Sequence, residues 1–249
     1  SLVGSEMCIR DRNKGNIYNT VLHSNKAWGL ALNGTGNIVS NTIANNSKGG
    51  LYARGALVAE PLQIYNNIFW RNYTSAVPTV GDLNNQIDVQ NATLYSNAVQ
   101  VDDATAEQPN AEYVYWNSSA GVVLGDKAAN INKTLSSDNE DMSYGPRFEA
   151  PDEATPLDKK YNIRPGRKLI NTGYRYMTGD SYNKAENDKW YTDLFAYYSF
   201  GSVEEPVAPG DSLARVMFVD AGGNRRIAGN SIDIGAYEYQ RLFYPNLYV

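Results

Sequence analysis

The densest cluster of side chains suited to chemistry lies near the end of the chain and combines carboxylates with arginines. It surrounds a pair of glycines and consists of Asp220, Arg225, Arg226, Asp233 and Glu238. Carboxylate oxygens are the ligands that Ca²⁺ accepts in loose geometries, so a calcium site is one interpretation. An arginine could instead donate a forked pair of hydrogen bonds to Asp220 or Asp233 and close the glycine loop. We favour the structural interpretation and predict no metal and no cofactor, with Ca²⁺ as the alternative.

Aromatic rings form a second group of candidates, because they stack on the faces of sugars as well as in protein cores. Trp70 and Tyr73 border the largest interruption of a sequence repeat, so we predict that they bind carbohydrate, with core packing as the alternative. His23 is the only histidine, which excludes a histidine-based metal cluster, and we expect it to stack or lie on the surface. Asp102 and Asp103 are adjacent, and this spacing does not predict a glycosidase acid pair.

A degenerate repeat over residues 16–99 must position these groups. Four segments alternate apolar and polar residues, which predicts strands, and they cover residues 17–21, 39–43, 64–68 and 95–99. Their aligned asparagines, Asn19, Asn41, Asn66 and Asn97, are 22, 25 and 31 residues apart, and residues 29–32 recur as residues 50–53. Short strands in a fixed order at this period predict three to four stacked coils of a parallel β-helix, with the asparagines hydrogen-bonded along the stack.

The periodicity fades after about residue 100. Longer loops are expected at residues 58–61 and 73–85, and further strands at residues 113–116, 121–124, 216–219 and 232–234. Aromatic and leucine residues at helical spacing predict one helix over residues 184–198. The sequence therefore predicts an all-β chain, with β-helix coils over residues 13–125 and an irregular C-terminal capping module with one short helix over residues 126–240.

Composition limits the classes of partner. The chain has 249 residues, 42% of them hydrophobic, and a formal net charge of −5, which is enough to bury a large core. The mild acidity, with no basic cluster, argues against nucleic acid as a partner. No apolar run approaches the roughly 20 residues that cross a bilayer, so we predict no membrane span in the visible chain, and we expect a monomer. The 19 tyrosines suit strands and also a surface that contacts sugars.

The first twelve residues resemble the translation of a sequencing-adapter read-through that recurs at the ends of metagenomic protein predictions. We therefore expect residues 1–12 to be non-native and the native chain to begin near Asn13, with an ordinary native strand as the alternative. This segment contains Cys8, the only cysteine in the sequence. Without it, disulfides and thiol catalysis are excluded.

The C-terminal residues carry a resemblance to a known family. Residues 220–229 and 232–239, preceded in order by residues 144–148, 161–166 and 169–173, resemble the end of bacterial choice-of-anchor Q domain proteins. Departures include Arg167-Lys168 where Ser-Pro is usual, Asn171 where Asp is usual, and a long insertion before Asp220. The resemblance implies a right-handed parallel β-helix of the pectate-lyase-like type, in a secreted or surface-attached bacterial protein. Residues 241–249 resemble the start of a truncated Bacteroidetes secretion tail.

The resemblance also suggests a catalytic alternative. Polysaccharide lyases of this fold abstract the proton beside a uronate carboxylate with a basic side chain, while a cation such as Ca²⁺ neutralises the acid. Lys48 and Arg54 flank a repeat strand, and Arg71 follows the next copy of the asparagine motif, so these three are the candidates for that chemistry. Because such residues are more often solvated edges of coils, we assign no catalytic residue.

Three functions follow as hypotheses. The leading one is the C-terminal portion of an extracellular or cell-surface bacterial β-helix protein, a scaffold that contacts polysaccharide or a cell-surface glycan. The second is a polysaccharide lyase or glycoside hydrolase whose catalytic coils lie mostly upstream of residue 13. The third is a structural stalk or adhesin.

Overall fold

The structure is a computed structural model. It describes residues 15–76 and 79–101, apart from the side chain of Val80, together with residues 146, 148, 160–164, 169–173, 220–224, 226 and 232–240. For residues 2–3, 8–9, 114–117, 122–124, 129–130 and 139–142 it describes the strands but not the side chains.

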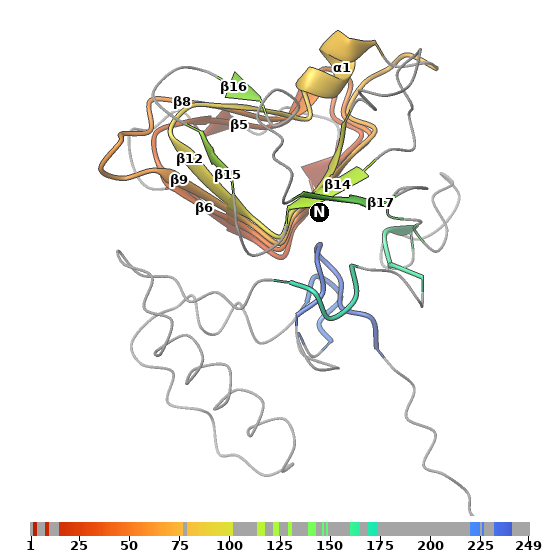
Figure 1. Ribbon diagram of the computed structural model, residues 1–249. Helices are drawn as coiled ribbons and strands as arrows, with labels where there is room; N and C mark the ends of the chain where they lie inside the picture. The colour runs from red at the N-terminus through yellow and green to blue at the C-terminus, as the bar shows by residue number, and fades with distance from the viewer. Residues whose placement is uncertain are drawn as a thin grey trace, which may run out of the picture.

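Short strands stack into three sheets, which we name A, B and C, and the chain passes through them in the fixed order C, A, B (Figure 1). The first coil contains β3 (Gly15–Tyr18), β4 (Val21–His23) and β5 (Trp28–Asn33). The second contains β6 (Gly36–Val39), β7 (Thr42–Ala44) and β8 (Gly49–Arg54). The third contains β9 (Leu62–Tyr65), β10 (Ile68–Trp70) and β11 (Ile87–Val89), and the fourth β12 (Ala92–Tyr95) and β13 (Ala98–Gln100).

Each of these strands pairs in parallel with its counterpart in the next coil. The predicted all-β class, the parallel β-helix-like stacking and the three to four coils are therefore confirmed. Two short strands before residue 15, β1 (Leu2–Val3) and β2 (Cys8–Ile9), pair in parallel with β4 and β5. Whether residues 1–12 are native stays a prediction.

The core lies inside the stack and is built from columns of apolar side chains. Ile17, Ile38, Ile64 and Leu94 occupy one position in four successive coils, and all four are buried. Leu30, Leu51 and Ile87 form a second column, in sheet B. Burying a side chain of this size contributes roughly 1.5–3 kcal/mol. The alternation of apolar and polar residues that predicted these strands therefore also determines which side chains point into the core.

The turn between sheets C and A corrects the predicted asparagine alignment. Its first residue has the left-handed conformation in every copy, with φ between 47° and 56°, and the four copies are Asn19, Ser40, Asn66 and Ser96. Its second residue is Thr20, Asn41, Asn67 or Asn97. The predicted column mixed these two positions, because asparagine suits both a left-handed turn and a ladder of amide hydrogen bonds. The strand pairing aligns Tyr18, Val39, Tyr65 and Tyr95 with one another. The turn residues that follow them at the same offset are therefore the equivalent positions.

Two buried ladders of side-chain amides run along the stack. In the first, Nδ2 of Asn41 donates to Oδ1 of Asn67 at 3.0 Å, and Nδ2 of Asn67 donates to Oδ1 of Asn97 at 2.9 Å. The second crosses the turn between sheets A and B, and successive side chains are 2.8 Å apart from Asn25 through Asn46 and Asn72 to Gln86. The predicted hydrogen bonding along the stack is confirmed, with a second ladder that was not predicted.

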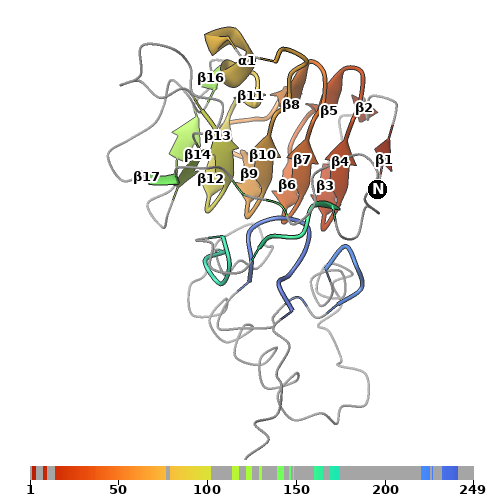
Figure 2. The ribbon, with the colours of Figure 1, turned by 90° about the vertical axis from the view of Figure 1, so that its right-hand side faces the viewer.

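After β13 the chain reverses its winding. Strands β14 (Val114–Asn117), β15 (Val122–Leu124) and β16 (Ala129–Asn130) pair antiparallel with β13, β12 and β11, and they cross the sheets in the order A, C, B. A last strand, β17 (Asn139–Met142), pairs antiparallel with β14 (Figure 2). Exposed strand edges are prone to further pairing, and here the reversed turn covers the edge of the fourth coil. The strands predicted at residues 113–116 and 121–124 are confirmed within one residue.

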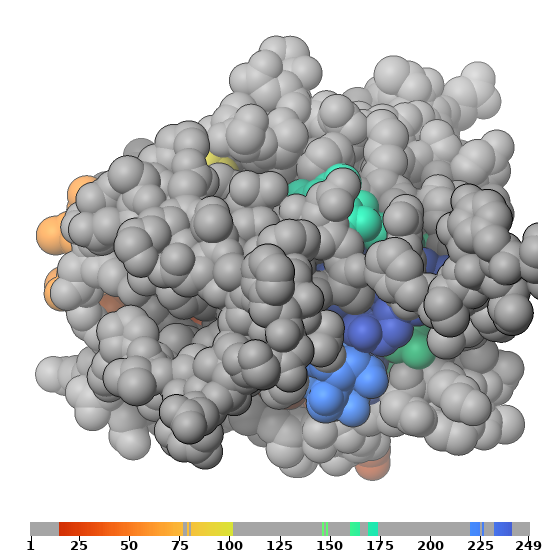
Figure 3. All heavy atoms as spheres, turned by 90° about the horizontal axis from the view of Figure 1, so that it is seen from below, coloured from red at the N-terminus to blue at the C-terminus, as the bar shows by residue number. Residues whose placement is uncertain are grey.

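The described C-terminal residues pack on the side of sheet A, not on the end of the stack. Phe148, Tyr161, Leu169, Ile234 and Tyr237 form one apolar cluster with sheet A residues that include Val21, Ile68 and Trp70. Backbone contacts join the same surfaces, because the amide of Gly235 donates to the carbonyl of Asn66 at 2.8 Å. Figure 2 shows these teal and blue segments next to the stack, and Figure 3 shows their atoms on the face seen from below. The predicted capping by residues 126–240 therefore holds for β16, which together with β14 and β15 pairs with the last coils, whereas the described residues from 148 onward lie on the side of sheet A.

Other predicted elements differ from the structure. Residues 232–234 have an irregular backbone instead of the predicted strand, because their amides and carbonyls bond to Leu169 and Gly173 and not to a neighbouring strand. The helix over residues 184–198 and the strand over 216–219 lie outside the described residues. A short helix that was not predicted, α1 (Val80–Asn84), lies in the loop of residues 73–85, and a capping box between Thr79 and Asp82 begins it. Among the described residues no helix has the length and apolarity to span a membrane.

The ladder predicts a large effect from one amide. We expect Asn67→Ala to lower the free energy of unfolding by about 3 kcal/mol, because it removes the side-chain partner of the buried backbone amide of Asn41 and of the carbonyl of Ile38. Chemical denaturation measures this loss. The matched control is Asn16→Ala. Water can replace the exposed hydrogen bonds that Asn16 accepts from Asn37, so this variant should lower the free energy of unfolding by well under half as much. Equal costs for the two variants would contradict the importance of the buried ladder.

Candidate functional site

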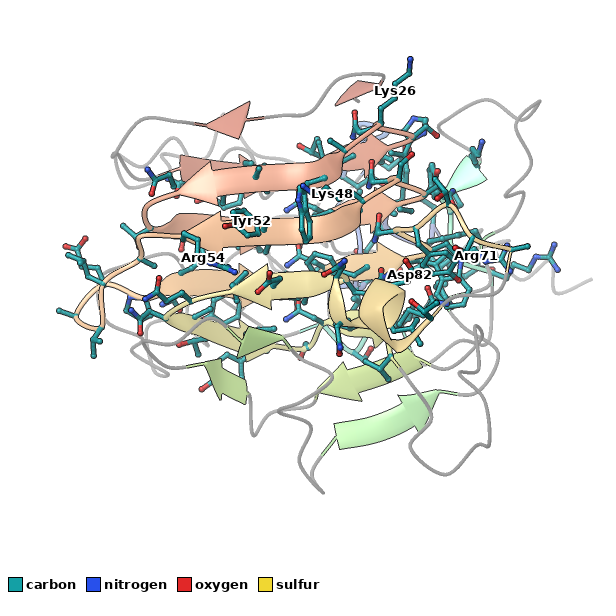
Figure 4. The ribbon with its side chains drawn as sticks, turned by 90° about the horizontal axis from the view of Figure 1, so that it is seen from above. Lys26, Lys48, Tyr52, Arg54, Arg71 and Asp82 are labelled. Carbon is teal, nitrogen blue, oxygen red and sulfur yellow. The ribbon has the colours of Figure 1, made fainter. Side chains whose placement is uncertain are left out.

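The outer face of sheet B carries a group of aromatic and charged side chains. The alternation that points Leu51 inward points Tyr52 outward, and Tyr52 lies in register between Ala31 of β5 and Asp88 of β11. Tyr52 and Asp88 are half-buried, and Arg54 emerges two residues further along the same strand. Figure 4 views this face, with Tyr52 and Arg54 side by side on β8.

These side chains form a continuous series of contacts across sheet B. Nζ of Lys48 lies 5.9 Å from the ring centroid of Trp28, and the rings of Trp28 and Tyr52 are 5.3 Å apart. The guanidinium carbon of Arg54 lies 4.3 Å from the ring centroid of Tyr52. Cation–aromatic contacts at exposed sites contribute roughly 0.5–1 kcal/mol each. We call Trp28, Lys48, Tyr52, Arg54 and Asp88 the sheet B platform.

Asp88 fixes the position of Arg54. Nη2 of Arg54 donates to both carboxylate oxygens of Asp88 at 3.0 Å, and Nη1 donates to the backbone carbonyls of Ala53 and Asp88 at 2.9 and 3.0 Å. Both side chains are partly exposed, so the pair adds little to stability, but its geometry holds the guanidinium against the Tyr52 ring. Because both terminal nitrogens of Arg54 already donate hydrogen bonds, its side chain presents a fixed positive charge and is not suited to act as a base.

The structure separates the three basic residues that the sequence grouped as lyase candidates. Lys48 precedes β8 and Arg54 ends it, so the two lie at opposite ends of a six-residue strand, about 20 Å long. Arg71 lies at the turn between sheets A and B, with φ of 52° and its backbone amide bonded to Oε1 of Gln100. Lys48 and Arg54 thus lie at opposite ends of the sheet B platform, and Arg71 lies near the turn that precedes Lys48.

The two predicted carbohydrate-binding rings lie apart from the sheet B platform. Trp70 is only 9% exposed and packs in the cluster between sheet A and the C-terminal residues, so its ring offers no free face for a sugar. This burial corrects the assignment of Trp70, and core packing, the stated alternative, describes it. Tyr73 is half-buried, its hydroxyl accepts a hydrogen bond from Nε2 of Gln100 at 2.9 Å, and burial raises its pKa.

The motif of carboxylates and arginines forms a network of hydrogen bonds to the backbone. Oδ1 of Asp220 accepts from the amides of Gly222 and Asn224, both at 2.8 Å, and its Oδ2 accepts from the amide of Glu238 at 3.0 Å. Oε2 of Glu238 in turn accepts from the amide of Asp233 at 3.0 Å. These contacts close the loop around Gly222 and Gly223 and support the structural interpretation of the motif. Asp102, Asp103 and Arg225 lie outside the described residues.

Arg226 is fully buried within this network, but it does not fork onto a carboxylate as predicted. Its Nη2 donates to the backbone carbonyls of Asp233 at 3.2 Å and of Gly235 at 2.5 Å. Burial lowers its pKa, and the carboxylates of Glu238, Asp233 and Asp220 oppose that change. Burial also raises the pKa of Asp233 to about 6, against the amides of Tyr239 and Asn171 that donate to its oxygens. Within the described residues, no three metal-ligating side chains come together.

His23 lies between sheet A and the C-terminal residues. Its ring is 8% exposed, 5.4 Å from the ring of Tyr161, and its Nδ1 is 3.1 Å from Oγ of Ser24. Burial lowers the pKa of His23 below its ordinary 6.5, and the positive charges of Lys160 and of the chain's amino terminus lower it further. The expectation that His23 stacks agrees with this position.

The lowered pKa predicts a pH dependence. Because the folded protein holds His23 neutral, the stability that this residue contributes is present above about pH 6.5 and is lost as the pH falls below that value. We expect the unfolding free energy of the wild type, measured relative to His23→Gln, to decrease between pH 7.5 and pH 5. Chemical denaturation at several pH values measures the difference, and two parallel pH profiles would show that His23 is not buried as described.

Comparison of the chain with models of protein families, with curated proteins and with solved structures found no match in any of the three. The resemblance to choice-of-anchor Q domain proteins therefore stays a hypothesis that rests on the C-terminal residues of the sequence.

Proposed function

We propose that this chain belongs to a secreted or surface-attached bacterial protein, in which a right-handed β-helix is a scaffold and the sheet B platform binds polysaccharide. The parallel stacking supports the handedness, because crossovers between parallel strands are right-handed in about 98% of cases. The ordered C-terminal motifs support the bacterial surface location.

The observation that carries the proposal is the arrangement around Tyr52. Its half-exposed ring lies next to a guanidinium that Asp88 holds in place, and it packs against the indole of Trp28, which is only 7% exposed and supports the ring. A half-exposed ring beside a fixed guanidinium–carboxylate pair suits a sugar, which presents apolar C–H faces to the ring and hydroxyl groups to the carboxylate oxygens. The platform needs no reorganisation to present these groups, which lowers the entropic cost of binding.

The catalytic alternative has less support among the described residues. Lyase chemistry requires a base and a charge-neutralising cation close together, and the structure places Arg54 in an ion pair at the far end of β8 from Lys48. We therefore propose binding without catalysis by the platform. A stalk or adhesin without glycan binding is the remaining alternative.

The test is binding to a panel of neutral and acidic polysaccharides, measured by affinity gel electrophoresis and calorimetry. We expect Tyr52→Ala to weaken binding about 3- to 10-fold, which corresponds to the 0.5–1.5 kcal/mol typical of an aromatic contact. Tyr52→Phe keeps the ring and should bind almost as the wild type does. Thr93→Ala, on sheet C, is the control for a substitution elsewhere on the stack.

Two results would contradict the proposal. Binding that is unchanged in Tyr52→Ala would remove the platform from the site. Failure of every polysaccharide to bind would favour the stalk or adhesin. Products that absorb in the ultraviolet as unsaturated uronates do would instead establish a lyase.

A further inference from the structure

A titratable side chain lies in the contact between sheet A and the residues that cover it. Strand pairing aligns His23, Ala44 and Trp70 in three successive coils, and all three are buried on the outer side of sheet A. We call the described residues between 148 and 240 the cover, and Figure 2 shows them next to the stack. His23 is the only histidine in the sequence, and histidine is the side chain whose ordinary pKa lies closest to neutral pH.

The surroundings of His23 favour its neutral form. Its ring lies 5.4 Å from that of Tyr161, a residue of the cover whose hydroxyl accepts from Nδ2 of Asn45 at 3.0 Å. Nε2 of His23 is buried and has no hydrogen-bond partner among the described residues, and Nδ1 lies 3.1 Å from Oγ of Ser24. Burial lowers the pKa of His23, and the positive charges of Lys160 and of the chain's amino terminus lower it further. A proton on this ring therefore adds a buried charge that faces other cations.

Backbone amides of the cover donate hydrogen bonds to the stack and report whether the two are in contact. The amide of Gly235 donates to the carbonyl of Asn66 at 2.8 Å, and the amide of Ala236 donates to Oγ1 of Thr42 at 3.0 Å. The packing here is close, because a Cβ added at Gly235 would lie only 2.6 Å from Cδ1 of Ile68. A contact of this kind has little room to admit water around a new charge.

A separate set of contacts holds the cover together. Asp233 joins two of its segments, because its Oδ1 accepts from the amide of Asn171 and its Oδ2 from the amide of Tyr239, both at 2.6 Å. Oδ1 of Asp220 accepts from the amide of Gly222 at 2.8 Å and closes the glycine loop. These bonds lie within the cover, so they can persist when it separates from sheet A.

The two groups respond to acid in opposite directions. Burial raises the pKa of Asp233 to about 6, and the charged groups around it are Arg226, Asp220 and Glu238. The stability that Asp233 contributes is therefore complete below its ordinary 3.8 and is lost as the pH rises through about 6. The stability that His23 contributes is present above about pH 6.5 and is lost as the pH falls. Mild acid thus weakens the contact with sheet A while it strengthens the cover.

We infer that the contact between the cover and sheet A is a pH-sensitive switch, in which a proton taken up by His23 in mild acid releases the cover as a folded unit. Release exposes the column of His23, Ala44 and Trp70. Linkage limits the effect, because one proton lowers the equilibrium constant for docking by at most about tenfold per pH unit. The switch is independent of the proposed polysaccharide binding, since the cover lies on sheet A and the platform on sheet B.

Amide hydrogen exchange followed by NMR at pH 7.5 and pH 5 tests the switch, with rates converted to protection factors so that the intrinsic pH dependence of exchange cancels. We expect the protection of Gly235 and Ala236 to fall about 3- to 30-fold, the upper value being tenfold per unit between pH 6.5 and pH 5. Gly222 and Asn224, whose amides bond to Asp220, should keep their protection.

Two variants and a matched control assign the effect to His23. His23→Gln cannot take up the proton, so the protection of Gly235 and Ala236 should be the same at both pH values. Lys160→Gln removes a cation that lowers the pKa of His23, so the fall should be smaller than in the wild type. Arg164→Gln removes an exposed cation from the same segment and should behave as the wild type does.

Several results would overturn the inference. The first is unchanged protection of Gly235 and Ala236 at pH 5 in the wild type, and the second is an equal fall in His23→Gln. A parallel loss of protection at Gly222 and Asn224 would mean that the cover unfolds instead of separating as a unit. If His23→Gln does not fold, Lys160→Gln and Arg164→Gln decide, and equal falls in these two variants would contradict the role of His23.

Discussion

The hydrogen bonds of the buried asparagine side chains are the interaction on which the rest of this structure depends. At each sharp turn the strand pairing is interrupted, and backbone groups inside the molecule need other partners. Asn67 supplies them, because its Nδ2 donates to the carbonyls of Ile38 and Tyr65 while its Oδ1 accepts from the amide of Asn41. Each turn is thereby joined to the next, and coils of unequal length keep one register. The long loop that contains α1 leaves the stack without moving the strands on either side.

Because the coils stay in register, each face of the stack carries its own set of side chains. Sheet A is covered by C-terminal residues that the Asp220 network holds in a compact loop, and His23 and Trp70 are buried beneath them. Sheet B places Tyr52 and Asp88 in one outward column. The same hydrogen bonds that stabilise the fold therefore set the spacing of the surface that we propose as the binding site.

Much of the stack could be predicted from the sequence, because alternation reports directly which side chains point inward. The columns that include Ile38 and Leu51 follow from that pattern alone. The predicted asparagine column mixed the two positions of a two-residue turn, because Asn suits both and the sequence cannot tell them apart. The capping box of Thr79 and Asp82 is a sequence signal that could have predicted helix α1.

The candidate site was less predictable, because it depends on contacts between residues distant in sequence. The burial of Trp70 depends on residues such as Ile234 and Tyr237, more than 160 positions further along the chain. The ion pair between Arg54 and Asp88 arises only once β8 and β11 are in register.

The most direct test of the account is hydroxyl-radical footprinting of the protein with and without a saturating polysaccharide that it binds. The central claim is that ligand binds on sheet B and its edge, while sheet A stays covered. The account predicts that Tyr52 and the segment around Lys48 become protected, and that residues 160–164 and 232–240 react equally in both states. Protection of those C-terminal residues with no change at Tyr52 would contradict it, because the ligand would then lie on the covering of sheet A.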